Sequence, residues 1–169
     1  MQKQKGFSLI ELLIVVAIIL IIAAIAIPNL LRARIAANES SAVSSIRTVN
    51  TAQISYQSAY PTVGYAVAMS NLGPAAAGAC AAPTSTNACL IDWAVSSATT
   101  VAKAKSGYFF NLAGTANNYT VGGSAAVFNQ SGVRDFCSIE DGVVRFQPVV
   151  AQSAPMIVSA TCVGWSNLN

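Results

Sequence analysis

The hydrophobic pattern sets the first thirty residues apart from the rest of the chain. From Phe7 to Ile27 the side chains form an almost unbroken apolar run of 21 residues, in which only Ser8 and Glu11 are polar. A membrane-spanning helix needs about 20 such residues, so the run is long enough to cross a bilayer. An ionisable group at the centre of a membrane costs about 2.5–3.5 kcal/mol, so Glu11 marks a function and requires a partner.

After Pro28 the pattern becomes amphipathic, with apolar side chains at the three- and four-residue steps of a helix face. The positions that we expect on the buried face are Ile35, Ala42, Val43, Ile46, Val49, Gln53, Tyr56 and Tyr60. The polar positions that fall largely between them are Arg32, Arg34, Asn38, Glu39, Ser45, Arg47 and Asn50. Pro61 cannot continue a helix, so the predicted helix ends near Tyr60.

A helix over residues 7–60 would be about 80 Å long. Its first half would have no partner within the chain, so it must be buried in lipid or in other copies of itself. This length and composition favour assembly over a free monomer.

Residues 61–106 are rich in Ala, Ser, Thr, Gly and Pro, which indicates loops and short irregular structure. Residues 107–163 contain short apolar or alternating runs, which indicate an antiparallel sheet. The expected strands are 107–112, 118–121, 125–128, 133–136, 143–146 and 156–158. Gly122-Gly123 and Asp141-Gly142 are predicted turns. The expected fold class is α+β, a long N-terminal helix packed on a small antiparallel sheet.

Lys3 and Lys5 precede the apolar run, so the positive-inside rule keeps that end cytoplasmic and places the remainder across the membrane. A cleaved secretory signal is one alternative. Its apolar region would be about 7–15 residues, shorter than this run, but the alanine-rich residues 23–26 keep the alternative open. A plain signal anchor is another alternative, and it assigns no role to Glu11.

The run from Gly6 to Val16 (GFSLIELLIVV) resembles the start of a type IV prepilin. The pseudopilins of type II secretion belong to the same superfamily. The resemblance implies cleavage between Gly6 and Phe7 by a prepilin peptidase, N-methylation of Phe7, and Glu11 as the fifth mature residue. Pro28 matches the proline at which the buried part of the helix is interrupted in filaments. Many relatives have a glycine about eight residues before that proline, whereas this chain has Leu20.

The resemblance also implies a division of the chain. Residues 1–6 are a leader, 7–28 a transmembrane or filament-core helix, and 29–60 the amphipathic half of that helix. Residues 61–169 form a head, with loops over 61–106 and the sheet over 107–163. The precursor would lie in a bacterial inner membrane, where the pilus assembly machinery would incorporate it into an extracellular filament, a helical homopolymer.

Glu11 and the new N-terminus would act together in such a filament. Cleavage frees an ammonium at Phe7, one helical turn from Glu11, and groups four residues apart share a helix face. The ammonium of one subunit can meet Glu11 of its neighbour, so that neither charge is buried alone. Such a pair would fix the axial register of packing more than it would add stability.

Four cysteines in an exported domain indicate two disulfides. Three connectivities exist, and we favour Cys80–Cys89 with Cys137–Cys162 because each closes a compact local region. The resemblance supports the second pair, since many type IV pilins cross-link a C-terminal loop in this way. Metal binding is the rival interpretation, but the four cysteines are dispersed for a zinc site and the chain has no histidine.

Catalysis has little basis in this sequence, and we expect neither an enzyme nor a cofactor. Without histidine, no Ser/His or Cys/His arrangement is available. Asp135, Glu140 and Asp141 form the one acidic cluster. Calcium sites are known in major pseudopilins, but a solvated Asp-Gly turn explains two of the three residues, so we expect no metal there.

Charge gives little support to nucleic-acid binding. Without Lys3 and Lys5 the mature chain keeps seven basic and six acidic side chains, so it is close to neutral. The head offers only Lys103, Lys105, Arg134 and Arg145 as cations. A near-neutral surface suits the close packing of many copies.

Three functions follow from these patterns. The first is a major type IV pilin, polymerised through the N-terminal helix into a filament for adhesion, twitching motility or DNA uptake. The second is a pseudopilin or a minor pilin. The third belongs to another class, a monomeric exported binding domain anchored by residues 7–27.

Overall fold

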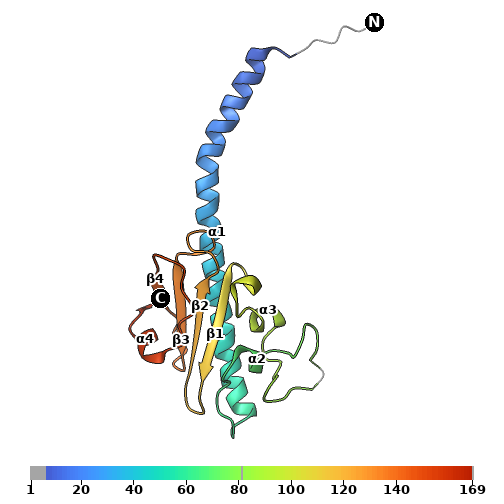
Figure 1. Cartoon of the computed structure of the whole chain (residues 1–169), viewed down its shortest axis with the longest axis vertical. Helices are drawn as coiled ribbons and strands as arrows, with labels where there is room; N and C mark the ends of the chain where they lie inside the picture. The colour runs from blue at the N-terminus through green and yellow to red at the C-terminus, as the bar shows by residue number, and fades with distance from the viewer. Residues whose placement is uncertain (1–6, 81, 169) are drawn as a thin grey trace. The chain divides into compact units, whose positions relative to one another are not determined.

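The computed structural model describes residues 7–80 and 82–168, and the predicted leader with Gly6 lies outside this part of the chain. The chain forms two compact units, residues up to Arg34 and residues from Ile35 onward. Helix α1 (Leu9–Ala59) contributes to both units (Figure 1). Its bounds lie within two residues of those predicted.

In the second unit α1 buries most of the predicted stripe. Ala42, Val43, Ile46, Val49, Gln53 and Tyr56 are buried, while Ile35 and Tyr60 are half-buried. The polar positions follow a different rule from the one expected. Glu39, Ser45 and Asn50 are buried as well, because each has a hydrogen-bonding partner in the head.

Five strands form one antiparallel sheet in chain order, which confirms the α+β class (Figure 1). They are β1 (Tyr108–Gly114), β2 (Tyr119–Ala125), β3 (Arg134–Ile139), β4 (Arg145–Pro148) and β5 (Ser166–Asn167). The predicted turn at Asp141-Gly142 joins β3 to β4. Gly142 adopts a φ of 72°, and its N–H donates to the carbonyl of Ile139 at 2.9 Å.

The predicted turn at Gly122-Gly123 is wrong, because both glycines lie within β2 and pair with β1 and β3. A Cβ on Gly122 would lie 2.1 Å from the carbonyl oxygen of Met156. One on Gly123 would lie 2.9 Å from the ring of Phe110. These glycines therefore serve close approach across the two faces of the sheet rather than chain reversal.

Two predicted strands are also wrong. Residues 125–128 leave the sheet at the end of β2, and the N–H of Phe128 is bonded by the side chain of Gln152. Residues 156–158 are extended but join no ladder, and they lead into helix α4 (Ser159–Val163). Since Met156 approaches Gly122 from the face of the sheet, its backbone is not placed to pair along an edge.

The inner face of the sheet packs on α1 and on residues 61–106. That region holds three short helices, α2 (Met69–Leu72), α3 (Trp93–Ser96) and η1 (Val101–Lys103). It contributes Ala66, Met69, Leu72, Ala88, Ile91, Val95 and Ala98 to the main core. The side chain of Gln53 attaches it to α1, donating to the carbonyl of Ala66 at 3.0 Å and accepting from its N–H at 2.9 Å.

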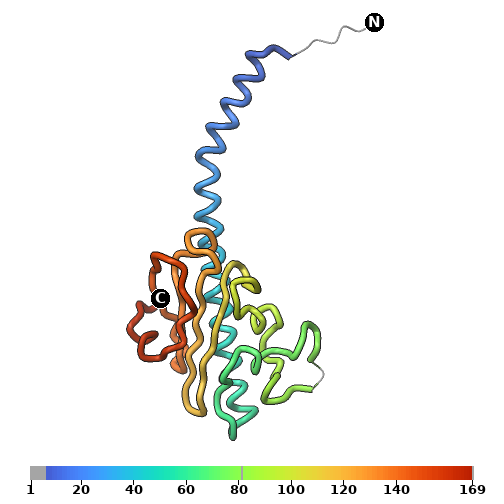
Figure 2. Tube along the Cα trace, viewed as in Figure 1, coloured from blue at the N-terminus to red at the C-terminus, as the bar shows by residue number. Residues whose placement is uncertain are grey.

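The outer face of the sheet is covered by the chain after residue 149. A second, smaller core there contains Cys137, Ile139 and Cys162, with Met156 and Trp165 packed against it. In Figure 2 this C-terminal segment (red) and residues 61–106 (green to yellow) run on opposite sides of the strands. β2 is therefore buried along its whole length.

The edge strands of the sheet are β1 and the two-residue strand β5. β5 pairs with β4, and the N–H of Leu168 donates to the carbonyl of Val144 at 2.9 Å. On the other side, Phe110 N–H of β1 donates to the carbonyl of Ala98 at 2.7 Å. The N–H of Leu112 donates to the side chain of Asn111 at 2.9 Å.

Candidate functional site

Glu11 lies in the first turn of α1 and is bonded to the residue that precedes the helix. The N–H of Ser8 donates to Oε2 of Glu11 at 2.9 Å, and the N–H of Leu12 donates to the carbonyl of Ser8 at 3.2 Å. A Ser-x-x-Glu sequence whose glutamate reaches back to the N-cap amide is half of a capping box. The spacing of Ser8 and Glu11 carries this signal, which the sequence analysis missed. Glu11 therefore fixes where α1 begins, besides being the one charge in the apolar run.

The apolar side chains of this unit are exposed. An 18-residue window of α1 has a mean hydropathy of 3.3 and no buried residue, so the helix is long and apolar enough to cross a membrane. Phe7, at the candidate new N-terminus, is 86% exposed. Leu9, Leu12, Leu13 and Val16 line a shallow apolar hollow of about 280 Å³. Burying one such side chain contributes about 1.5–3 kcal/mol, so this surface favours lipid or other apolar helices.

α1 continues through Pro28 without a break. Proline has no N–H, so the carbonyl of Ala24, four residues earlier, lacks its usual helical donor. Membrane helices tolerate such a position when neighbouring groups satisfy the carbonyl. With Leu20 where many relatives have glycine, the helix upstream of Pro28 also retains a residue that favours helix.

The head is attached to α1 by an ion pair. Glu39 accepts two hydrogen bonds from Arg134, the shorter at 2.6 Å, and one from the N–H of Val133 at 3.1 Å. The guanidinium of Arg134 lies 5.6 Å from the ring centre of Phe136 and 5.2 Å from that of Phe146. Charge and aromatic packing therefore fix β3 against the helix at the same point.

A second polar contact lies deeper in the head. Asn50 of α1 donates to the hydroxyl of Ser138 at 2.9 Å and accepts from the hydroxyl of Tyr119 at 3.1 Å. Burial raises the pKa of Tyr119 well above its ordinary value, so the phenol stays a donor. Because these groups are out of water, each depends on the others for its hydrogen bonds.

The four cysteines form two disulfides, Cys80–Cys89 and Cys137–Cys162. These are the pairings favoured in the sequence analysis. The first closes a loop before α3. The second joins β3 to α4 and holds the C-terminal segment on the outer face of the sheet.

The acidic cluster is divided among separate partners. Asp141 pairs with Arg145 at 2.5 Å, and this hydrogen bond lowers the pKa of the Asp141 carboxyl. Asp135 is buried and accepts from the hydroxyl of Ser153, and burial raises its pKa. Within residues 7–80 and 82–168, no three His, Cys, Asp or Glu side chains gather as metal ligands would.

Comparison with known proteins agrees with the N-terminal site. Residues 1–27 match the family described as the prokaryotic N-terminal methylation motif. Over 40 residues the chain is 65% identical to the type IV wide pilus major component PilA4 of Thermus thermophilus. Over 54 residues it is 48% identical to the type IV major pilin protein PilA of Myxococcus xanthus. Both names denote pilus components, and neither denotes an enzyme.

The similarity is confined to part of each protein. The aligned segments are 24% and 32% of this chain, and they span 30% and 24% of the two relatives. No solved structure matches the chain. The resemblance to type IV pilins drawn from the sequence is confirmed by the motif and by these relatives, and the architecture is type IV pilin-like.

Proposed function

We propose that this chain, which carries the N-terminal methylation motif on a type IV pilin-like fold, is the major structural subunit of a type IV pilus. One observation carries the proposal. The apolar half of α1 is exposed along its length and holds a single charge, Glu11, at its beginning. Such a surface needs other apolar helices, and copies of the same chain supply them in equal number.

The proposed assembly begins in the membrane. The precursor is held there by α1 until a prepilin peptidase cleaves between Gly6 and Phe7 and Phe7 is methylated. Glu11, bonded to its own Ser8 amide in the single chain, then accepts the Phe7 ammonium of a neighbouring subunit. Pro28 lies in the same apolar segment, where packed helices or water satisfy the freed carbonyl of Ala24.

The head would then form the surface of the filament. Its two disulfides suit an oxidising environment outside the cytoplasm. Adhesion, twitching motility and DNA uptake are the uses that fit such a filament, and its partners would be further copies of the chain and the inner-membrane assembly machinery. The role is structural rather than catalytic.

The experiment that tests the proposal is an intact mass of protein sheared from the cell surface. We expect a mass that lacks residues 1–6, carries one added methyl group and has four hydrogens fewer than the reduced chain. A processed mass confined to the membrane fraction would instead support a pseudopilin or a minor pilin. An unprocessed chain would overturn the prepilin interpretation altogether.

A further inference from the structure

A shallow cavity of about 380 Å³ lies in the head between α3 and η1. An indole and two ammonium groups share it. The indole of Trp93 is left 38% exposed, although tryptophan is the largest apolar side chain. The residues that line the cavity are Trp93, Ala94, Ser97, Ala102, Lys103, Ala104 and Lys105. The small side chains leave room beside the aromatic ring, and none of these residues is acidic.

The two lysines differ from the arginines of the sheet. Arg134 and Arg145 are neutralised by ion pairs with Glu39 and Asp141. Among residues 35–80 and 82–168, neither Lys103 nor Lys105 has a carboxylate within ion-pair distance. Their charges are therefore available to an external anion at one place on the head.

Lys105 is held in position before any ligand arrives. It pairs with Tyr108 across a two-residue turn in which Ser106 and Gly107 both have positive φ, 49° and 72°. This is the geometry of a type I′ turn, and it is rare for serine. The ammonium of Lys105 also lies 3.1 Å from the hydroxyl of Ser45 on α1. A cation already ordered loses less entropy when it binds.

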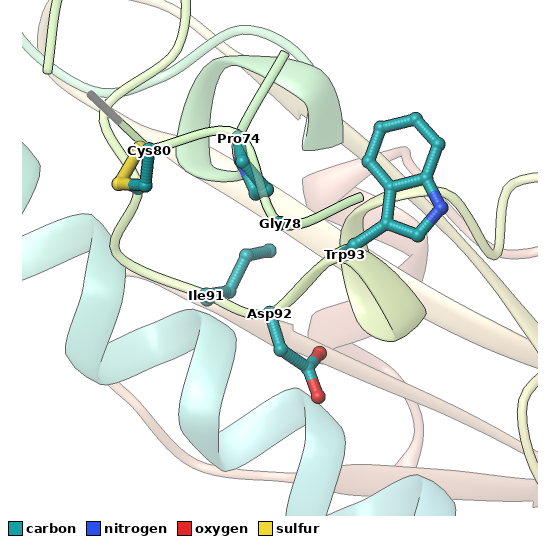
Figure 3. Close-up of a pocket in the computed structure, with 7 residues that line it drawn as sticks. Pro74, Gly78, Cys80, Ile91, Asp92 and Trp93 are labelled. Carbon is teal, nitrogen blue, oxygen red and sulfur yellow. A yellow bond between two sulfur atoms is a disulfide. The ribbon is translucent and has the colours of Figure 1, made fainter. Parts of the chain in front are cut away.

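The nearest acidic side chain along the chain is turned away from the indole. Asp92 caps α3, accepting from the N–H of Val95 at 2.8 Å. In Figure 3 its carboxylate and the Trp93 indole point in opposite directions. Trp93 also borders a second cavity of about 260 Å³ beside Pro74, Ile91 and the Cys80–Cys89 disulfide. The indole thus presents apolar surface to both hollows.

We propose that Trp93, Lys103 and Lys105 form a binding site for an acidic polysaccharide. The ammonium groups of Lys103 and Lys105 bind the carboxylates of uronic acid residues. The flat apolar ring of Trp93 packs against a sugar ring, and the indole N–H is available to a hydroxyl. The site belongs to the head alone, so it does not depend on polymerisation of the chain.

The sparse charge favours a polysaccharide over a nucleic acid. Nucleic-acid affinity comes largely from many phosphate contacts that release counterions, on a polymer with one charge per about 1.7 Å in duplex DNA. Residues 61–169 hold four basic and four acidic side chains, so the head has no excess of positive charge. Two cations beside one aromatic ring match a polymer with one carboxylate per sugar.

Binding of polygalacturonate to the full chain in a non-ionic detergent tests the proposal. In the double variant Lys103→Gln with Lys105→Gln we expect the Kd to rise about tenfold, because two surface charge contacts are lost. Arg47→Gln removes a cation of α1 that does not line the cavity, and it should change the Kd less than about twofold. Trp93→Leu should weaken binding about fivefold at both low and high salt, since it removes packing rather than charge.

Two further polymers decide between the outcomes. Methyl-esterified polygalacturonate has the same backbone without the charge, and we expect it to bind at least about tenfold more weakly. Equal binding of the ester, or no effect of the lysine substitutions, would overturn the proposal. So would lysine-dependent binding of single-stranded oligo(dT) that is tighter than binding of polygalacturonate, because the occupant would then be a nucleic acid. Single chains in detergent keep this result separate from any failure to form filaments.

Discussion

The two halves of α1 lie on one continuous helix but are stabilised in different ways. From Leu9 to Ile27 the helix has one polar side chain, Glu11, and the membrane-length window of α1 has no buried residue. From Ile35 to Ala59 it carries more polar residues, yet it is buried along one face. Glu39, Asn50 and Gln53 each hold a different part of the head. The second half has its partners within the chain, whereas the apolar window of the first half is not buried by any part of the chain that the structure describes.

This difference bears on where specificity comes from. Apolar contact is strong but nondirectional, and it accepts many alignments of one helix on another. Directional hydrogen bonds set the alignment in the second half of α1. The first half has one such group, Glu11, so under the proposed function the register of assembly depends on that residue.

The largest effect should follow from Glu11→Ala. Removing one partner of a buried ion pair costs about 3–5 kcal/mol, so surface filaments should fall at least about a hundredfold. The thermal unfolding of the head should not change, because Glu11 lies in the other unit. Blots of the sheared and membrane fractions measure the loss of filaments. The control is Arg32→Gln, because Arg32 lies on the same helix but outside the apolar run, and this variant should assemble normally. Filaments at normal levels would show that assembly does not depend on Glu11.

Within the head, removing a disulfide should have the next largest effect. The chain-entropy model gives about 3.5 kcal/mol for the 25-residue separation of Cys137 and Cys162. It gives about 2.5 kcal/mol for the 9-residue separation of Cys80 and Cys89. Denaturant unfolding of the two double-serine variants, followed by tryptophan fluorescence, compares them. A larger loss at Cys80–Cys89 than at Cys137–Cys162 would contradict the order that loop length predicts.

A smaller loss is expected from Glu39→Gln, which keeps the shape and removes the charge. We expect the free energy of unfolding to fall by about 1–2 kcal/mol, a discounted value because the Arg134 side chain is 35% exposed. The matched control is Glu140→Gln, an exposed carboxylate, with a change within about 0.5 kcal/mol. Equal effects would mean that aromatic packing alone positions Arg134.

The smallest effects concern pH, and two aspartates should give opposite signs. Burial raises the pKa of Asp135 above 3.8, so its contribution to stability is present below that value and is lost as pH rises through the folded pKa. The bond from Arg145 lowers the pKa of Asp141, so its contribution is present above 3.8 and is lost as pH falls through the folded pKa.

Measuring the free energy of unfolding at several pH values between about 2 and 7 separates the contributions of the two aspartates. Asp135→Asn should remove the part of the free energy of unfolding that decreases as the pH rises. Asp141→Asn should remove the part of the free energy of unfolding that decreases as the pH falls. The same sign for both variants would contradict the assignment of burial to Asp135 and ion pairing to Asp141.

Local signals predicted much of this fold. The apolar period set the bounds of α1 to within two residues, and turn chemistry located the loop at Asp141-Gly142. The motif around Glu11 indicates a candidate site whose role stays a prediction, and the hydrogen bond from the Ser8 amide was not foreseen. Each of these features depends on neighbours within a few positions in the chain.

Features that depend on distant residues could not be predicted. The backbone of Met156 leaves no room for a side chain at Gly122, and the ring of Phe110 leaves none at Gly123. From the sequence alone, the two adjacent glycines look like a turn. The carboxylate of Glu39 is buried on α1 because it accepts hydrogen bonds from Arg134, which lies 95 residues away in the sequence. A periodicity argument treats such a side chain as solvated, because its partner lies in another element.

The edges of the sheet have a consequence where many copies of the chain are crowded together. An exposed strand edge is a template on which another chain can add, and that is a common route to aggregation. Here Ala98 and Asn111 accept from two amides of β1, and the other edge strand, β5, is only two residues long. Heads crowded in a membrane or along a fibre can therefore touch without fusing their sheets. One edge that is partly occupied and another that is very short should keep a concentrated pool of subunits from forming amyloid.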